Sequence, residues 1–511
     1  MYSLFERLIN PFPPQAPATP PTQLFAFFRH YMKGSSWLFV MMAVITGCVA
    51  AMEVSLFAFL GSIVDKLNTH TPETFWESEK YNLIGMGALL LIVLPLSVFL
   101  QSSLMHQGIL GNFPMRIRWL AHRYLLGQSY QFFQDEFSGR IATKIMQTAL
   151  ALRVTIMRMV DVLLYMLVYF SGILFLAASL DWRLLIPLLS WFVIYCGLLR
   201  YFLPQLSKVA EAQADARSDM TGRIVDTYTN IATVKLFSHS QREEQYAKEG
   251  MSHFVKTVYP QMRLATSLSS LVWFLNALLI FSIAAISIWL WSNLAITAGS
   301  IAAAIALVLR LNGMAQTIMW DVSSIFENIG TVQDGLNTIA APRLVQDAED
   351  AYDITLSKTD IEFQDVLFNY GKQAKTLLKD FNLTIRSGEK IGLVGRSGAG
   401  KSTLVNLILR FYDIQSGRIL IDGHDIKTIK QESLRKHIGM VTQDTALLHR
   451  SVRENLMYGR PEASEEEMIA AAKQAEAHEF ILELEDSQGR KGYDAHVGER
   501  ALNFLAASVN A

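Results

Sequence analysis

Six apolar runs dominate the first part of the chain, and each is long enough to cross the hydrocarbon core of a bilayer as a helix. A helix satisfies its backbone hydrogen bonds internally, which a segment surrounded by lipid requires. The runs lie near residues 37–63, 82–104, 159–180, 182–203, 269–291 and 295–316. The composition agrees, because 51% of the 511 residues are hydrophobic and only 18% are charged. We therefore expect an α-helical six-span transmembrane domain at residues 36–325.

The connections between these runs differ in length and in charge. Those after the second and fourth runs are long and helical in pattern, whereas the others are short. The loop 105–158 contains seven basic residues but only two acidic ones. The basic residues are Arg116, Arg118, Arg123, Arg140, Lys144, Arg153 and Arg158, and the acidic ones are Asp135 and Glu136. Because basic residues accumulate in cytoplasmic loops, we place both long loops and both termini in the cytoplasm. We expect these loops to extend the membrane helices beyond the bilayer. Two small independent inserts are the alternative, which the lack of turn-forming residues disfavours.

Residues 1–35 read as a cytoplasmic N-terminal lead-in. Six prolines between Pro11 and Pro21 favour an extended chain, and the segment lacks the apolar core and cleavage site of a signal peptide. Residues 24–33 are expected to form a short interfacial helix. The net charge of the whole chain is −1, so no overall field favours a nucleic-acid partner.

Two charged residues within the spans are candidates for a membrane cavity. Glu53 lies deep in the first run and Arg310 near the inner end of the sixth. Charges inside a membrane are costly, so each is expected to face a cavity or to pair with another polar group. For Arg310 we favour snorkelling to the inner interface. For Glu53 a cavity or ion-pair role and an ordinary packing role both stay open.

A glycine-rich segment fits the P-loop pattern G-x-x-x-x-G-K-[ST]. It consists of Gly395, Arg396, Ser397, Gly398, Ala399, Gly400, Lys401, Ser402 and Thr403. An apolar run at 390–394 reads as a buried strand before it, and 404–409 reads as a helix after it. In such a loop the backbone N–H groups surround phosphate oxygens, the lysine reaches the β- and γ-phosphates, and the Ser402 hydroxyl can bind Mg²⁺. A plain glycine-rich turn is the alternative, and the strand–loop–helix context argues against it.

The pattern around the P-loop predicts a second domain. Residues 326–357 end in an acidic, polar stretch and read as a linker. From residue 360 the pattern becomes β-type, with strands expected at 361–363, 366–370 and 381–385. Strands followed by a P-loop and a helix are typical of an α/β nucleotide-binding domain, which we place at residues 358–511.

Six spans with two long cytoplasmic loops, fused to a P-loop domain, resemble the ATP-binding cassette (ABC) exporters of the half-transporter type, as found in bacterial multidrug and lipid exporters. The resemblance covers residues from about 20 to 500. Two segments look like the coupling segments of that family, which seat on the nucleotide-binding domains. They are residues 132–140, and residues 221–226 continuing to 233–237.

The resemblance also implies roles in the nucleotide site, with ATP and Mg²⁺ as cofactors. Tyr370 lies where the family stacks an aromatic ring on adenine, although an ordinary strand aromatic is the alternative. Gln443 matches the Q-loop glutamine, which approaches Mg²⁺ and the attacking water. Residues 497–500 match the segment just before the family's signature motif.

After Arg500 the match to the family pattern stops, and neither the Leu-Ser-Gly-Gly-Gln signature, nor the general base, nor the switch histidine follows in the 511 residues. We therefore expect a partial nucleotide-binding domain, truncated before the signature motif, with no catalytic residue present. Back-translation of 501–511 with one added G and a free choice of third bases reads Gly-Val-Lys-Leu-Ser-Gly-Gly-Gln-Arg-Gln-Arg. That reading suggests that one base was lost after codon 500.

The resemblance implies an ATP-hydrolysing translocase that exports a hydrophobic or amphipathic substrate, such as a lipid or a drug. Peptide export is the second substrate class considered. One chain carries six spans and one nucleotide-binding domain, so a second half-transporter is implied, most simply as a homodimer in the bilayer. The expected location is the bacterial inner (plasma) membrane, with the nucleotide-binding domain in the cytoplasm. A truncated, inactive remnant or a non-hydrolysing partner subunit is the alternative.

Overall fold

The structure is a computed structural model, which describes residues 2–136, 138–237, 239–371, 377–396, 398–442 and 447–497. The chain divides into two compact units. The first unit contains residues 1–346 together with Arg410–Asp413, and the second contains residues 347–409 and 414–511.

Six helical segments of the first unit are long and apolar enough to cross a membrane, as the sequence predicted. They cover Ser36–Thr69, Pro72–Leu126, Gly139–Leu180, Trp182–Thr229, Ser240–Ser292 and Ala298–Ile339. Their main helices are α3 (Ser36–Thr69), α4 (Pro72–Ala88), α5 (Leu94–Ser103), α6 (Asn112–Leu126), α8 (Ser138–Met157), α9 (Leu164–Leu180), α10 (Leu185–Thr229), α12 (Ser240–Ser292) and α13 (Ala298–Ile339). Shorter elements complete the unit: α1 (Tyr2–Glu6), α2 (Leu24–Met32), α7 (Tyr130–Asp135), α11 (Ile231–Leu236), the π-helical turns η1 (Leu89–Val93), η2 (Leu104–Ile109) and η3 (Arg158–Leu163), and the 3₁₀ turn η4 (Trp182–Leu184).

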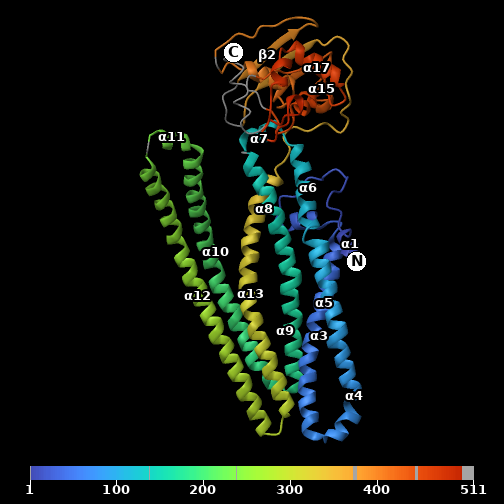
Figure 1. The fold of residues 1–511 in the computed structure, drawn as a ribbon, viewed down its shortest axis with the longest axis vertical. Helices are drawn as coiled ribbons and strands as arrows, with labels where there is room; N and C mark the ends of the chain where they lie inside the picture. Colours follow the sequence, from blue (N-terminus) through green and yellow to red (C-terminus); the bar gives the residue numbers. More distant parts are fainter. Residues whose placement is uncertain are drawn as a thin grey trace. The chain divides into compact units, whose positions relative to one another are not determined.

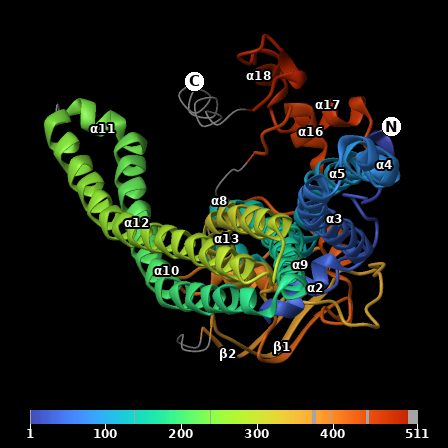
Figure 2. The ribbon, with the colours of Figure 1, turned by 90° about the horizontal axis from the view of Figure 1, so that it is seen from below.

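The long predicted loops are continuations of the membrane helices, which confirms the expected extension beyond the bilayer. Helix α10 has 45 residues, which corresponds to about 68 Å at 1.5 Å per residue and is more than twice the thickness of a bilayer core. Helix α12, with 53 residues, runs alongside it. In both ribbon views α10 and α12 diverge from the other long helices toward the short helix α11 (Figures 1 and 2). A helix pair therefore projects from the body of this unit.

Small residues set the close approach of α3 and α13. A Cβ atom on Gly299 would overlap the carbonyl oxygen of Gly61, so the two backbones touch at this position. Small residues allow such contacts between helices in a membrane. Asp65 binds the N-terminus of α13 beside this crossing, because its carboxylate accepts hydrogen bonds from the Gly299 N–H (2.8 Å) and the Thr297 hydroxyl (2.6 Å). A carboxylate at this end also complements the helix dipole.

Residues 2–35, which we call the N-terminal clasp, pack against the first unit. Phe27 and Tyr31 of α2 are fully buried, as is much of Phe5 in α1. Arg123 of α6 donates through Nη1 to the carbonyl oxygens of Pro13, Pro14 and Gln15 at 3.1, 3.2 and 2.7 Å. The short helix expected at 24–33 is present as α2. The prolines do keep their segment free of helix and strand, but side chains of α6 hold it in place.

Helix α13 extends further than the sequence suggested. It continues to Ile339 and ends shortly before Pro342, which cannot continue a helix. The first part of the predicted linker 326–357 is therefore helical. Its inner face is buried, with Val332, Leu336 and Ile339 at most 3% exposed.

The second unit contains an antiparallel sheet with the strand order β2-β1-β3-β4. The strands are β1 (Ile361–Phe368), β2 (Leu378–Ile385), β3 (Ser416–Ile421) and β4 (His424–Asp425). The two strands expected at 361–363 and 366–370 are one strand, and a bulge separates Phe363 from Val366. Asp365 adopts φ = 48° at the bulge, and its backbone N–H donates to Asn382 Oδ1 at 2.9 Å. The polar pair at 364–365 marks a bulge and not a turn.

The described residues of the second unit also contain five short helices. They are α14 (Lys401–Ile408), α15 (Gln431–Lys436), α16 (Val452–Leu456), α17 (Glu465–Gln474) and α18 (His478–Leu482), with 3₁₀ turns η5 (Met457–Gly459) and η6 (Gly492–Asp494). The buried strand expected at 390–394 is not formed. Val394 is 99% exposed, and Val441, in another apolar stretch, is 100% exposed. The described residues contain no strand beside residues 390–394 or beside Val441. An isolated strand lacks the hydrogen bonds to a neighbouring strand that would stabilise it.

Candidate nucleotide site and polar cluster of the membrane helices

The P-loop connects residue 394 to α14 through glycines that take left-handed backbone conformations. Gly398 has φ = 82° and Gly400 has φ = 89°. Side chains with a Cβ atom rarely adopt these angles, so the turn depends on glycine at both positions. Gly400 is also the N-cap of α14. The loop therefore delivers the chain directly to a helix N-terminus, where free N–H groups favour an anion.

The side chain of Lys401 folds back over the loop. Its Nζ donates to the carbonyl oxygens of Gly395 (2.8 Å) and Arg396 (3.1 Å). Among the described residues no carboxylate lies within ion-pair distance of this ammonium group. A positive charge that is bound only by neutral carbonyls next to a helix N-terminus fits the phosphates of a nucleotide.

Tyr370 lies beside the P-loop, as the adenine-stacking prediction requires. Its hydroxyl is 3.0 Å from the Thr403 hydroxyl in the first turn of α14. The ring packs edge-on against Phe368, with 4.9 Å between the centroids, and it is 37% exposed. Tyr370 is therefore partly exposed next to the phosphate-binding segment, and its stacking on adenine stays a prediction.

The structure brings most of the predicted nucleotide residues together. Gly395, Arg396 and residues 398–403 form one loop and helix start, and Ser402 is exposed in the first turn of α14. Ser397 and Gln443 lie outside the described residues. The Mg²⁺ roles of Ser402 and Gln443 stay predictions.

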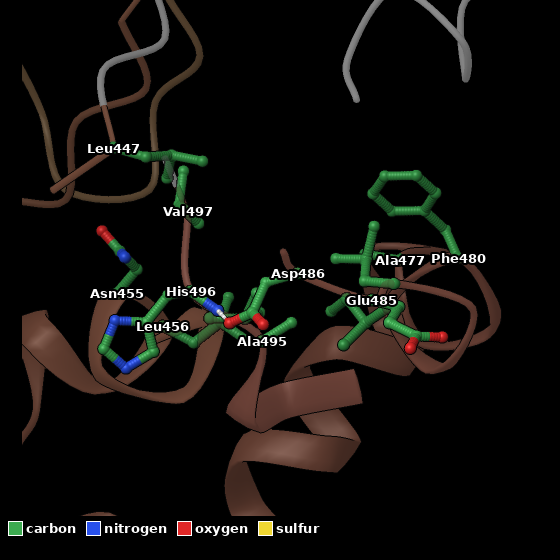
Figure 3. Close-up of a pocket in the computed structure, with 13 residues that line it drawn as sticks. Leu447, Asn455, Leu456, Ala477, Phe480, Glu485, Asp486, Ala495, His496 and Val497 are labelled. Atoms are coloured by element: carbon green, nitrogen blue, oxygen red, sulfur yellow. Dashed lines mark hydrogen bonds between the residues drawn. The ribbon is translucent and has the colours of Figure 1, made fainter. Parts of the chain in front are cut away.

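An apolar cavity of about 290 Å³ lies in the helical part of the second unit (Figure 3). Its wall includes Leu456 and Phe480, and Asp486 lies at its edge. The Asp486 carboxylate accepts hydrogen bonds from the backbone N–H groups of His496, Arg490 and Gln488 and from Arg490 Nε. These donors, foremost the His496 N–H, hold the pKa of Asp486 far below its usual range. The lining includes no P-loop residue, so this cavity is separate from the nucleotide site.

The first unit brings Glu53 and Arg310 together. Arg310 Nη2 of α13 lies 3.1 Å from Glu53 Oε2 of α3. Tyr165 of α9 donates to the same carboxylate oxygen at 2.6 Å and lies 3.3 Å from Arg310 Nη2. The structure thus gives Arg310 an ion-pair partner among the membrane helices, and the snorkelling favoured for it stays a prediction. Sequence reasoning missed Tyr165, because its aromatic ring looked like the lipid-facing aromatics of the other spans.

A second polar group lies between α3, α5 and η3. Gln101 Nε2 donates to Asp161 Oδ1 at 2.7 Å and to Thr46 Oγ1 at 2.9 Å. Nearby, Arg158 pairs with Asp321 of α13. Asp161 and Arg158 both lie in the π-helical turn η3, and such turns are frequent at functional sites. Polar contacts thus connect the same helices at several levels.

Both coupling segments that the resemblance implied contain a short helix, α7 and α11. Residues Arg410–Asp413 group with the first unit. Within this unit the Tyr412 hydroxyl donates to Gln134 Oε1 at 2.5 Å. The Phe411 ring stacks on Tyr130, with 4.7 Å between the centroids. Helix α7 therefore contacts Phe411 and Tyr412 within the first unit.

Two family descriptions match the chain. The ABC transporter transmembrane region matches residues 36–314, and the ABC transporter domain matches residues 378–509. The match to the ABC transporter domain continues past Arg500 to residue 509. It does not bear out the expectation that the nucleotide-binding domain is truncated before the signature motif.

Individual relatives and one solved structure agree with this result. An uncharacterized ABC transporter ATP-binding protein of Haemophilus influenzae is 52% identical over 507 residues, which are 99% of this chain and 82% of that protein. The putative multidrug export ATP-binding/permease protein YgaD of Bacillus subtilis is 31% identical over 326 residues, or 64% of this chain and 55% of the relative. A bacterial Atm1-family ABC exporter with ATP bound has a similar fold, with a TM-score of 0.76 and 22% identity. That likeness covers 93% of this chain and 81% of the other.

Proposed function

The chain belongs to the ABC transporter family, and from this premise we propose that it is a half-transporter that uses Mg-ATP to export a hydrophobic or amphipathic substrate. It is an integral membrane protein with an ATP-binding domain in the same chain. The observation that carries the proposal is Lys401, whose ammonium group lies over the P-loop carbonyls without a carboxylate partner in the described chain. ATP phosphates would supply the missing negative charge, with Lys401 and the N–H groups of α14 as donors and Ser402 as a ligand of Mg²⁺.

We further propose that the functional form is a dimer, most simply a homodimer. The α10–α11–α12 tip exposes large apolar side chains far beyond the apolar part of either helix. Tyr228, Leu236 and Phe237 are 70%, 77% and 61% exposed there. Apolar groups gathered outside the bilayer indicate a protein interface. In a dimer, ATP-driven closure of the nucleotide-binding domains would shift the membrane helices between two states.

The proposed location is the bacterial inner membrane, with the nucleotide-binding domain in the cytoplasm. The basic excess in the loop 105–158 supports this orientation. The scarcity of charge in the spans favours a lipid or amphipathic drug as substrate, and peptide export stays the second class. One relative, YgaD of Bacillus subtilis, is described as a putative multidrug export ATP-binding/permease protein.

A non-hydrolysing partner subunit is the alternative. Under this alternative the 511-residue chain binds Mg-ATP but releases little phosphate.

Binding of a fluorescent ATP analogue to the full chain in nanodiscs tests the proposal. Lys401→Ala removes a charged donor worth about 1.5–3 kcal/mol, so affinity should fall about 10- to 100-fold. Lys379→Ala, an exposed lysine of β2, is the matched control and should leave affinity unchanged. Equal affinity of the Lys401 variant and the wild type would refute the assignment of the site. Phosphate release that Lys401→Ala abolishes would exclude the non-hydrolysing alternative, and ATP-dependent uptake into inside-out vesicles would test export.

A further inference from the structure

The polar cluster of Glu53, Tyr165 and Arg310 has features of a binding site, and not only of a structural ion pair. Its members come from three different helices, α3, α9 and α13. The helices α3 and α9 approach closely here, because a Cβ on Gly172 would lie 3.0 Å from the Val54 side chain. A charge pair in a membrane protein is expensive unless it has a function or a strong compensating geometry. The inference that follows rests on the proposed export function.

Arg310 uses only part of its hydrogen-bonding capacity. Its side chain is 49% exposed, against 24% for Glu53. Only Nη2 has partners, which are Glu53 and Tyr165. Within the described chain, Nη1 and Nε have none. A guanidinium group carries five N–H donors in a fixed plane, which match a carboxylate or phosphate through two parallel hydrogen bonds. Both edges that offer such a pair of donors include Nη2, so the donors that remain unused beside the cluster are the separate N–H groups of Nη1 and Nε.

Tyr169 adds an unsatisfied hydroxyl to the same place. It lies one helical turn after Tyr165, and the two rings stack with 5.7 Å between their centroids. The residue is 0% exposed, and its hydroxyl has no hydrogen bond of normal geometry in the described residues. Arg310 lies close enough to act on this hydroxyl as a charge and as a distant hydrogen-bond donor, and Glu53 acts on it as a charge. A buried hydroxyl without a partner is unfavourable, so such a group calls for a second state in which it is used.

We propose that Glu53 is a displaceable internal counter-ion and that Arg310 binds the anionic group of an amphipathic substrate. In the empty state Glu53 neutralises Arg310. When a carboxylate or phosphate accepts a hydrogen bond from Nη1 of Arg310, Glu53 turns to accept hydrogen bonds from Tyr165 and Tyr169. This releases Nη2 for a second hydrogen bond to the bound anion. The Tyr169 hydroxyl then gains its missing partner, and the displaced carboxylate stays hydrogen-bonded. The apolar part of the substrate lies against the surrounding spans.

The free groups of the cluster favour an anion over a cation. Glu53 Oε2 already accepts from both Tyr165 and Arg310, and only Oε1 of this carboxylate has no partner in the described residues. The unused donors are more numerous, because they include Arg310 Nη1 and Nε and the Tyr169 hydroxyl. The neighbouring Asp161 carboxylate accepts from the neutral donors Gln101 and Thr46. A cationic amphiphile would need to take Arg310's place on Glu53, and this is the opposing outcome of the test.

Equilibrium binding of three dodecyl amphiphiles to the full chain in nanodiscs tests this inference without ATP. The probes are dodecyl phosphate, dodecyltrimethylammonium and neutral dodecyl maltoside, and competition with a fluorescent alkyl phosphate reports their affinity. Dodecyl phosphate should bind at least 10-fold more tightly than the neutral probe. Arg310→Gln should remove that preference. Glu53→Gln should raise dodecyl phosphate affinity several-fold, because it removes the internal competitor. Such a gain cannot come from misfolding. Tyr169→Phe should lower the affinity a few-fold.

The controls are Lys66→Gln and Glu79→Gln, which remove the Lys66–Glu79 pair of α3 and α4 outside the cluster and should change nothing. The inference would be overturned if the wild type bound dodecyltrimethylammonium more tightly than the other two probes and Glu53→Gln abolished this preference. Equal binding of all three probes would also overturn it. Nanodiscs with phosphatidylglycerol identify the source of the anionic group. Weaker probe binding there supports a membrane lipid as the occupant, and unchanged binding supports another transported anion. ATP binding at Lys401 does not enter this measurement, so the proposed function and this inference can fail separately.

Discussion

A buried hydrogen-bond chain connects α10, α12 and α13, and its strength can be predicted. Trp191 Nε1 donates to Asn276 Oδ1 at 2.9 Å, and Asn276 Nδ2 donates to Asn312 Oδ1 at 2.7 Å. Asn276 is 1% exposed and Trp191 is 3% exposed. Asn276→Leu keeps a similar side-chain volume but leaves the Trp191 N–H and the Asn312 oxygen without these partners. The change therefore isolates the polar contribution of the chain.

Two estimates of the free-energy cost of losing these hydrogen bonds differ, and the location of the residues within the membrane spans determines which estimate applies. Each buried group without a partner costs about 1–3 kcal/mol in a soluble protein, or about 2–6 kcal/mol for both. Inside a membrane the unfolded chain also finds partners, and measured pairwise energies average about 0.6 kcal/mol with a maximum near 1.7 kcal/mol. We expect the membrane value to hold, because the three residues lie within the spans. The coupling between Asn276 and Asn312 should therefore be about 0.6–1.7 kcal/mol.

A double-mutant cycle measures this coupling. The free energy of unfolding in mixed micelles is compared for Asn276→Leu, Asn312→Leu and the double variant. Asn328→Leu, on α13 like Asn312, is the control partner, because among the described residues Asn328 bonds only to Ser324 one turn away. Its cycle with Asn276→Leu should be additive. A coupling between 276 and 312 below about 0.3 kcal/mol, the ordinary limit of additivity, would refute the reasoning.

Three further predictions concern other parts of the chain. Gly299→Ala should lower the free energy of unfolding by about 1–3 kcal/mol, because the new methyl group overlaps the Gly61 carbonyl. Thermal unfolding measures this, and Gly313→Ala on the same helix, with open space around it, should be neutral or slightly stabilising. Tyr370→Ala should weaken ATP-analogue binding by about 1–3 kcal/mol while Tyr370→Phe keeps most of it, and equal losses would contradict ring stacking. Burial, and secondarily Lys33, lowers the pKa of His30 from its ordinary 6.5. Below pH 6.5 the unfolded state therefore binds more protons than the folded state, and the free energy of unfolding should decrease as the pH falls. An unchanged pH slope of the melting temperature in His30→Gln would disprove this contribution.

The membrane spans could be predicted from the sequence because their cause is local. Each run must match the bilayer and satisfy its own backbone, so composition over about 20 residues decides the matter. The helix ends were harder to place, since polar helix continues as long as no breaker intervenes. The P-loop could also be predicted from the sequence, because the loop requires glycine where the backbone takes left-handed angles, as it does at Gly398 and Gly400.

What the sequence did not reveal depends on contacts between distant residues. The pairing of Glu53 with Arg310 joins positions 257 residues apart, and nothing in either local pattern indicates the other. The bulge at Asp365 depends on Asn382 in the next strand. The run at 390–394 has the apolar pattern of a strand, but a strand also needs a neighbour, which the described residues do not supply. Local pattern determines what a segment can form, and partners determine what it does form.

Residues 13–15 of the N-terminal clasp are held by hydrogen bonds to their main-chain carbonyl oxygens. Arg123 binds three consecutive carbonyl oxygens, and Trp119 Nε1 donates to one of them, the Pro13 oxygen. Every residue type offers such an oxygen, and proline lacks the N–H that would draw the segment into a helix or sheet. The residues at 13–15 can therefore diverge freely during evolution as long as the segment stays extended. Selection should act instead on Arg123 and Trp119, so the residues that specify this attachment lie in α6 and not in the segment that α6 holds.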